Sequence, residues 1–378
     1  MLYLLVEHYN NWLKAHDLGS LRLFQIVTFQ TTLAILSGFV ICIMLGRPVI
    51  GWLRRQKIGD SPRFDQAEMD QLMAGKKGVP TMGGLLIIFS IVATALLLAN
   101  LKNFYVEMGL LCLVWLGGVG AIDDWLKLTA ARRNGSRQGL TSREKLMFQI
   151  GLGVLLAYFT WHYGSNEEKY LYFPFLKHTA VPLKLGAYVA IATLVMTGSS
   201  NAVNLTDGLD GLAAGCMAIV SFTFCVLTLI IGNSHWASEL LLPYVQATDQ
   251  MAVLAGAMAG ACVGFLWFNC NPASVFMGDT GSLAMGGLIG YIAIVVRQEV
   301  VLFLVGGIFV IEAVSVMIQV GYFKYSRRRF GEGRRVFLMA PLHHHFQRKG
   351  WTEQQVVVRF WLIGAMLAAM ALATVKVR

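Results

Sequence analysis

The chain has 378 residues, of which 56% are hydrophobic and only 14% are charged, and its net charge is +10. A soluble domain carries roughly 25% charged residues, so this composition excludes a soluble protein with a single apolar core and indicates a lipid bilayer as the solvent. The six cysteines form no CxxC pair, and five of them lie in apolar runs. This placement favours small core side chains over disulfides or metal ligands.

Ten apolar runs follow one another along the chain, each close to the roughly 17–25 residues that a helix needs to cross the hydrocarbon core. We therefore expect one integral membrane domain over residues 1–378, with an all-α polytopic fold of about ten transmembrane helices. The runs are 23–46, 80–101, 104–122, 146–163, 185–203, 211–231, 250–268, 281–297, 300–323 and 356–375.

The loops between these runs fall into two alternating sets that differ in their content of basic residues. One set carries 21 Lys and Arg residues, whereas the other set, which includes both termini, carries 9 when Arg297 at the end of the eighth run is counted with it. The positive-inside rule places the richer set in the cytoplasm and both termini outside. The cytoplasmic set consists of 47–79, 123–145, 204–210, 269–280 and 324–355.

The loop between the fourth and fifth runs contains two short segments, Lys169–Phe173 and Ala180–Leu183, on either side of turn-forming residues. Aromatic and β-branched residues that flank a turn are typical of a hairpin. We expect a short β-hairpin on the extracytoplasmic side.

The first cytoplasmic loop ends in Lys76-Lys-Gly-Val-Pro-Thr-Met-Gly-Gly84. Glycines near a helix start free backbone N–H groups for an anion, and Lys76 adds positive charge. The residue order of a Walker A loop is absent, and basic residues before a span also act as topology signals. In the next cytoplasmic loop, Lys127 lies one helical turn after Asp123 and is either a salt-bridge partner or a phosphate clamp.

Five aspartates lie at the cytoplasmic ends of spans, although a carboxylate at a span centre is unfavourable by about 2.5–3.5 kcal/mol. Asp123 and Asp124 close the third span, Asp207 and Asp210 follow the fifth, and Asp279 precedes the eighth. Adjacent aspartates repel, which predicts a cation or a shared proton between them, and oxygen ligands without cysteine favour Mg2+. Asp207 or Asp210 taken alone can also be a helix cap or a solvated loop charge.

Three consecutive histidines, His343, His344 and His345, follow a proline in the last cytoplasmic loop. On a helix they point in three directions, so all three cannot bind one ion. Each can hydrogen-bond phosphate or move a proton near pH 7, which favours a functional role.

Two further segments carry polar or aromatic residues that suit a site. Glu312 and Gln319 lie seven residues apart in the ninth span, on one helix face that is directed either to the bundle or to the site. The segment Phe265-Leu-Trp-Phe-Asn269 offers an aromatic wall for base stacking or for interfacial anchoring.

Five motifs resemble, in order, those of the polyprenyl-phosphate N-acetylhexosamine-1-phosphate transferase superfamily, and most closely those of its phospho-N-acetylmuramoyl-pentapeptide-transferase family. They are Asp123-Asp124, Asn201–Gly211, Phe265–Asn269, Phe276–Asp279 and Ala340–His345. The resemblance implies transfer of phospho-MurNAc-pentapeptide from UDP-MurNAc-pentapeptide to undecaprenyl phosphate, with Mg2+, which gives lipid I and UMP. This reaction is the first membrane step of peptidoglycan synthesis. The resemblance also implies a cytoplasmic cleft in the bacterial inner membrane and often a homodimer, and it implies no nucleic-acid partner.

The resemblance also assigns roles to matching residues. Asp279 matches the Mg2+ ligand. Asp123 and Asp124 match a catalytic pair, one of which deprotonates the lipid phosphate or attacks as a nucleophile. His343, His344 and His345 match the catalytic histidine motif. The residues that match substrate-binding positions are Lys76, Lys127, Asn204, Asp207, Asp210, Asn269, Phe276, Gly278 and Gln319.

Two other functions compete with this interpretation. A sister enzyme would transfer GlcNAc-1-phosphate from UDP-GlcNAc to the same lipid, but the histidine triplet argues against it. A transporter of an anionic metabolite would place its polar residues near the bilayer midplane and break helices in paired halves. In this chain the polar residues gather at one face.

Overall fold

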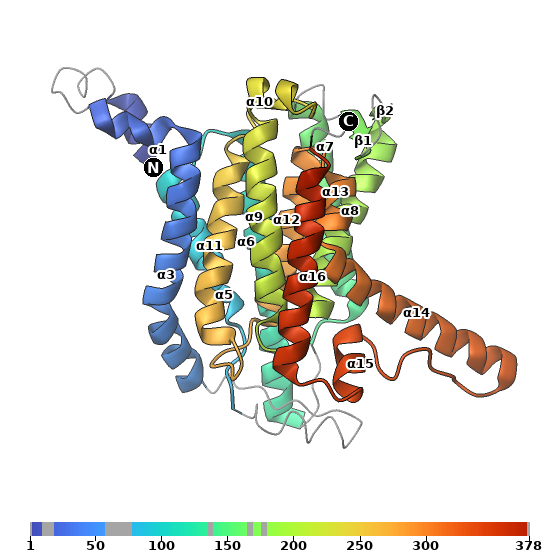
Figure 1. Cartoon of the computed structure of the whole chain (residues 1–378). Helices are drawn as coiled ribbons and strands as arrows, with labels where there is room; N and C mark the ends of the chain where they lie inside the picture. The colour runs from blue at the N-terminus through green and yellow to red at the C-terminus, as the bar shows by residue number, and fades with distance from the viewer. Residues whose placement is uncertain are drawn as a thin grey trace.

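The structure is a computed structural model that describes residues 2–9, 19–56, 78–134, 139–164, 169–174 and 180–375. Long helices stand side by side in an upright bundle, and one of them leaves the bundle at its lower end (Figure 1). Among the described residues, seven helices are long and apolar enough to cross a membrane. The prediction of an all-α polytopic membrane protein is therefore confirmed.

The ten predicted spans each overlap a helix of the structure, and shorter elements lie between them. In chain order, the elements are α1 Leu2–His8, η1 Gly19–Gln25, α3 Val27–Arg55, α5 Gly84–Leu98, α6 Phe104–Asn134, α7 Ser142–Tyr163, β1 Tyr170–Tyr172, β2 Ala180–Pro182, α8 Leu185–Thr206, α9 Leu212–Ile231, α10 Ser234–Glu239, α11 Met251–Asn269, α12 Gly278–Val295, α13 Glu299–Val305, α14 Gly307–Phe330, α15 Leu342–Arg348 and α16 Glu353–Ala373.

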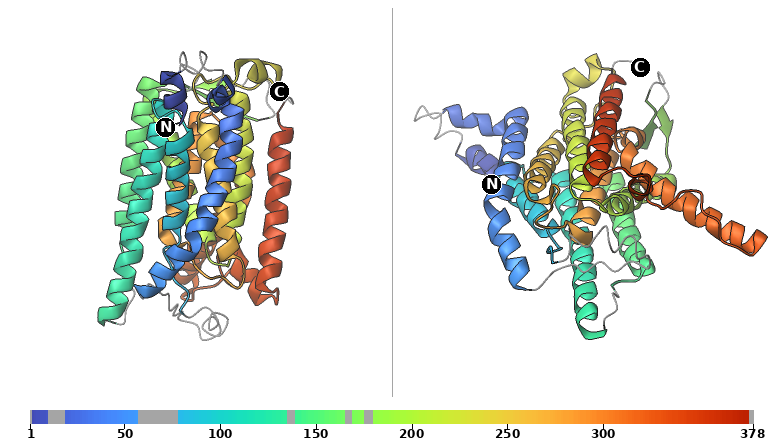
Figure 2. Two further views of the ribbon diagram at one scale, coloured as in Figure 1. Left: turned by 90° about the vertical axis from the view of Figure 1, so that its left-hand side faces the viewer. Right: turned by 60° about the horizontal axis from the view of Figure 1, so that its bottom comes forward.

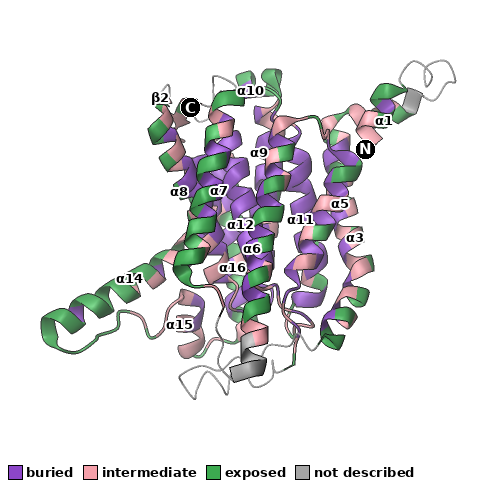
Figure 3. Cartoon of the chain, turned by 180° about the vertical axis from the view of Figure 1, so that it is seen from behind, coloured by how far each residue is buried: buried purple, intermediate pink, exposed green. Residues whose placement is uncertain are grey.

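The centre of the bundle is formed by α11 and α12, which are buried almost all round (Figure 3). Both helices are rich in Gly and Ala, and small side chains let neighbouring helices approach closely in a membrane. The outer helices α3 and α16 expose large apolar side chains such as Met44, Leu362 and Met366. In water this surface would be unfavourable, whereas lipid tails solvate it.

Helix α5 begins at Gly84, later than the predicted start of the second span at residue 80. The preceding residues run alongside the segment before α12. Gly83 N donates to Phe276 O (2.8 Å), Gly84 N donates to Met277 O (2.9 Å), and Phe276 N donates to Pro80 O (2.8 Å). Non-helical backbone is tolerated at membrane depth only where its polar groups are paired within the protein. The two glycine N–H groups that the sequence suggested as an anion seat are therefore already used by carbonyl oxygens.

The predicted ninth span, 300–323, is not one continuous helix. The chain turns at Gly306, which ends α13 and precedes α14. Beyond this point α14 runs outward, away from the other helices (Figures 1 and 2). Its exposed side chains are largely apolar, including Ile311, Met317 and Tyr325. Periodicity could not reveal this break because the apolar pattern continues through it.

The predicted β-hairpin is present. Strands β1 and β2 pair antiparallel, with Leu171 opposite Val181. The guanidinium of Arg297 is buried beneath the hairpin, where its Nε donates to Tyr170 O (2.8 Å), and it also forms an ion pair with Glu299. The hairpin, α10 and the end of α16 lie at one end of the bundle, and α15 lies toward the other (Figure 1).

Candidate active site

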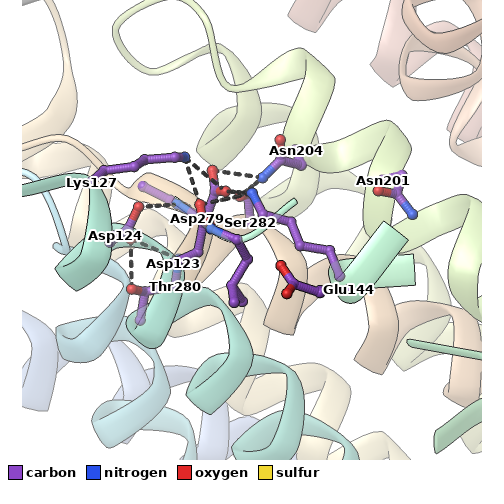
Figure 4. Close-up of polar contacts among 12 residues, drawn as sticks. Asp123, Asp124, Lys127, Glu144, Asn201, Asn204, Asp279, Thr280 and Ser282 are labelled. Atoms are coloured by element: carbon purple, nitrogen blue, oxygen red, sulfur yellow. Dashed lines mark hydrogen bonds and ion pairs between the residues drawn. The ribbon is translucent and has the colours of Figure 1, made fainter. Parts of the chain in front are cut away.

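Two helices that are distant in sequence bring three acidic residues together at the end of the bundle opposite the hairpin. Asp123 and Asp124 lie on α6, and Asp279 lies in the first turn of α12. One carboxylate oxygen from each of the three lies within 4.8 Å of the others. Asn204, near the end of α8, donates from Nδ2 to Oδ1 of Asp279 (2.9 Å). Figure 4 shows Asp279 at the centre of these contacts.

Two lysines lie within this carboxylate cluster. Nζ of Lys127 is 2.6 Å from Oδ2 of Asp123 and 3.0 Å from Oδ2 of Asp279. Nζ of Lys145 is 2.7 Å from Oδ2 of Asp123 and 2.5 Å from Oδ2 of Asp279. Three carboxylates thus face two ammonium groups. Opposite charges at this distance stabilise one another in a partly desolvated site, and the excess carboxylate still favours a cation.

Lys145 is a site residue that the sequence analysis missed. It lies in the first turns of α7, where a basic residue before an apolar run reads as a topology signal. A local signal was nevertheless present, because Thr141 and Glu144 form a capping box that fixes the start of α7. The residue before the box, Leu140, donates from its backbone N–H to Oδ1 of Asp123 (2.7 Å). The start of α7 therefore contacts the carboxylate cluster through the backbone N–H of Leu140 and through Nζ of Lys145.

Asp124 differs from Asp123 in its partners. Its Oδ2 accepts from Thr280 N (3.0 Å) and Thr280 Oγ1 (2.7 Å), and its Oδ1 accepts from Asp279 N (3.2 Å). The first N–H groups of a helix have no partner within the helix and carry partial positive charge. Asp124 of α6 satisfies these groups on α12 and so fixes the position of Asp279.

Gly278 precedes Asp279 and has a φ of +73°, a conformation that L side chains rarely adopt. A β-carbon at this position would lie 2.6 Å from Oδ2 of Asp124. The turn into α12 therefore requires glycine both for its backbone and for the approach of Asp124.

We expect the substitution Gly278→Ala to lower the thermal unfolding midpoint by roughly 3 °C or more, because a left-handed conformation is unfavourable by about 1–2 kcal/mol for a residue with a β-carbon. Thermal unfolding of the purified protein in detergent measures this. Gly151→Ala in α7 is the matched control, since a β-carbon there meets nothing within 4 Å. An unchanged midpoint for Gly278→Ala would contradict the described turn.

Asp207 and Asp210 lie in the turn between α8 and α9 and have different surroundings. Burial, together with the nearby carboxylates of Asp279 and Asp124, raises the pKa of the Asp207 carboxyl to about 7, and the carboxyl accepts a hydrogen bond from the backbone of Gly278, beside the cluster. Asp210 instead accepts from Asn271 Nδ2 (3.2 Å) and from Ala273 N (3.1 Å). These bonds hold the loop between α11 and α12.

Asn269 and Gln319 also hold backbone segments in this structure. Asn269 accepts from Gly211 N (3.1 Å) and donates to Val275 O (2.9 Å), so it ties the turn after α8 to the loop before α12. Gln319 on α14 donates to Phe337 O (3.1 Å) and accepts from the backbone of residues 336 and 337. Phe276 lies in the segment that pairs with Pro80. Lys76 lies outside the described residues.

The three histidines lie on α15 and do face three directions, each with a different partner. His343 is buried and contacts Glu312 of α14. Nδ1 of His344 lies 2.9 Å from Oε1 of Gln347. His345 accepts from Leu338 N at Nδ1 (3.1 Å). His343 therefore joins α15 to α14 and His345 joins it to the preceding loop, whereas Gln347, the partner of His344, lies on α15 itself.

The sequence matches a family model described as glycosyl transferase family 4 over residues 106–297. Three proteins named phospho-N-acetylmuramoyl-pentapeptide-transferase are similar to the chain over nearly its whole length. The protein from Desulforapulum autotrophicum is 44% identical over 96% of this chain and 97% of its own length. The protein from Desulfotalea psychrophila is 43% identical over 94% and 96%, and the protein from Thermodesulfovibrio yellowstonii is 44% identical over 96% and 97%.

Proposed function

The chain belongs to the phospho-N-acetylmuramoyl-pentapeptide-transferase family, and on this premise we propose that its aspartate cluster is the site at which phospho-MurNAc-pentapeptide passes from UDP-MurNAc-pentapeptide to undecaprenyl phosphate. The products are lipid I and UMP. An oxygen of the lipid phosphate forms the new bond to the phosphorus that carries MurNAc, and the bond from that phosphorus to the UMP oxygen breaks. One carboxylate takes a proton from the lipid phosphate or, in a two-step route, attacks first.

The observation that carries this proposal is the convergence of Asp123, Asp124 and Asp279 within 4.8 Å, next to two lysines. Both substrates are polyanions, so positive charge has to offset their repulsion before an oxygen can approach phosphorus. Lys127 and Lys145 lie 2.5–3.0 Å from Asp279, where they can turn from a carboxylate to an incoming phosphate. A cluster that only stabilised the fold would not need an excess of acid beside a helix start.

The three carboxylates could hold a divalent cation, and the proposal assigns Mg2+ to Asp279, with Asp123 and Asp124 beside it. The donor set fits a hard ion, because all the donors are oxygens and several lie close together. When bound, the ion neutralises charge on the diphosphate and on the leaving UMP. The protein's own contribution is positional: Asp124 fixes the first turn of α12, and Asn204 orients the Asp279 carboxylate through Oδ1.

The charge distribution supports a cytoplasmic location for this site in a bacterial inner membrane. The loops that carry the aspartates belong to the set with 21 Lys and Arg residues, although 204–210 and 269–280 themselves contain none, and the set rich in basic residues remains in the cytoplasm. UDP-MurNAc-pentapeptide is a cytosolic substrate and undecaprenyl phosphate a membrane one, so a site at the inner interface is accessible to both. The turn that holds Asp207 and Asp210, and the residues Asn269, Phe276 and Gln319, are the proposed surroundings of the nucleotide sugar.

The test is a UMP-release assay with the purified protein, undecaprenyl phosphate and either UDP-MurNAc-pentapeptide or UDP-GlcNAc. We expect turnover of the MurNAc substrate alone, with loss of activity in a chelator and recovery with Mg2+. Turnover of only UDP-GlcNAc would identify the sister enzyme. Flux of an anionic metabolite into liposomes without any UMP release would identify a transporter and overturn the proposal.

A further inference from the structure

Glu312 and His343 form a buried polar pair that none of the proposed catalytic steps uses. Glu312 lies on α14 and His343 on α15, and they are 0% and 1% exposed. Oε1 of Glu312 accepts from His343 N (3.1 Å), and Oε2 lies 3.3 Å from Nδ1 of the same histidine. One carboxylate thus accepts a hydrogen bond from the backbone of His343 and lies within ion-pair distance of its ring. Burial of such polar groups is unfavourable unless they contact one another.

The other edge of the His343 ring faces the turn between α8 and α9. A β-carbon at Gly208 would lie 2.4 Å from Nε2 of His343, so the ring packs directly against the Gly208 backbone. The residue before Gly208 is Asp207, whose carboxyl lies beside the aspartate cluster. Any shift of the His343 ring therefore has to move this turn or open a gap beneath it.

Two backbone N–H groups of the turn donate to side chains of other segments. Asp210 N donates to Oε1 of Glu353 (2.8 Å) and Gly211 N donates to Oδ1 of Asn269 (3.1 Å). Both bonds lie on the side of the turn that leads into α9. On the side of Asp207 and Gly208, the ring of His343 packs against the Gly208 backbone, and the Asp207 carboxylate accepts a hydrogen bond from the backbone of Gly278.

We propose that Glu312 is a positioning residue, which sets Asp207 and the turn 207–211 for the nucleotide sugar by holding His343 beneath Gly208. The inference rests on the proposed function, because it treats this turn as part of the UDP-substrate site. It also gives His343 a role that its 1% exposure allows. A side chain so deeply buried acts on the substrate through the backbone above it.

The test compares Glu312→Ala and Glu312→Gln with the unmodified protein in the UMP-release assay, with each substrate varied in turn. We expect Glu312→Ala to raise KM for UDP-MurNAc-pentapeptide by about tenfold or more and to leave KM for undecaprenyl phosphate within about twofold, as is expected when one substrate's binding surface is disturbed. Glu312→Gln retains an oxygen that can accept from His343 N and should recover much of the loss. A decrease in kcat alone, with both KM values unchanged, would overturn the proposal.

Glu299→Ala is the matched control. Glu299 is a glutamate that is 2% exposed and paired with Arg297 near the hairpin, at the opposite end of the bundle. Its loss should lower the thermal midpoint without a change in either KM. If Glu299→Ala raised KM for the UDP substrate as strongly as Glu312→Ala, general destabilisation would explain both, and the positioning role would be wrong.

Amide hydrogen exchange separates failure of this inference from failure of the proposed function, because it requires no turnover. We expect Glu312→Ala to increase the rate of amide exchange in residues 207–212 and to leave the rate in α11 unchanged. His343→Ala should have the same effect, and the double variant should show no further increase. Unchanged exchange at 207–212 would refute the inference whatever the substrate is. Faster exchange in a protein that turns over only UDP-GlcNAc would retain the positioning role and reject the proposed substrate.

Discussion

Asp279→Asn is expected to reduce UMP release by about 10³-fold or more, even at saturating Mg2+. The carboxylate is the common partner of Lys127, Lys145 and Asn204, and it is the proposed ion ligand. A metal ion contributes several kcal/mol to stabilisation of the transition state, and each 1.36 kcal/mol corresponds to a factor of ten in rate. An amide keeps the shape of the side chain but has only one acceptor oxygen and no charge. The loss of activity should therefore reflect the missing negative charge more than a change in side-chain packing.

The measurement is UMP release as a function of Mg2+ concentration, together with thermal unfolding in detergent. Asp249→Asn is the matched control, because Asp249 is also a partly buried carboxylate next to a helix start, that of α11, but lies on the side of the hairpin. We expect the control to retain near-normal activity. Activity of Asp279→Asn close to that of the unmodified protein, with a normal Mg2+ response, would contradict the ion assignment.

Lys145→Met is expected to have the second largest effect, with two changes in opposite directions. Loss of one cationic group from a site that stabilises developing phosphate charge should lower kcat by about 10²–10³-fold. At the same time the concentration of Mg2+ that gives half-maximal activity should fall by roughly tenfold, because an ammonium group among the carboxylates repels a divalent ion by one to several kcal/mol. Substitution of a lysine with a purely structural role would not lower the Mg2+ requirement.

Lys102→Met is the matched control for this substitution. Lys102 forms an exposed ion pair with Glu7 (3.3 Å) on the opposite side of the bundle, and exposed pairs contribute only about 0–1 kcal/mol. Its kcat and its Mg2+ response should both remain unchanged. The interpretation of Lys145 would be wrong if Lys145→Met required more Mg2+ than the unmodified protein, because the lysine would then be assisting the ion rather than competing with it.

The sequence predicted the helical membrane fold well because lipid restricts the choice of backbone. A long apolar run in a bilayer has to pair its own N–H and C=O groups, which a helix does within the segment. The ten runs therefore correspond to helices, and the hairpin appears where its residues indicated. The short start of α5 and the turn at Gly306 were not predictable in this way. Both depend on contacts with other segments or on a change in direction that leaves the apolar pattern intact.

The candidate site was predicted as a set of residue types rather than as an arrangement. Carboxylates at several span ends indicated a cation site because such groups are unfavourable near lipid and rare unless they are used. Residue type alone could not distinguish Asp123, which contacts two lysines, from Asp124, which caps α12. It also did not separate Asp207, beside the cluster, from Asp210, which holds a loop.

By itself, then, the sequence determined that the chain folds in a membrane, roughly where its apolar helices lie, and which aspartates and histidines are candidate site residues. Those properties follow from hydropathy and residue type, which are local. Only the tertiary structure decided that Lys145 enters the cluster, that Glu312 reaches His343, and that His343 lies beneath Gly208. The contacts of Lys145 join residues 22 and 134 positions apart, and the contact of Glu312 with His343 joins residues 31 positions apart. They form because helix packing, rather than any local pattern, sets which side chains meet.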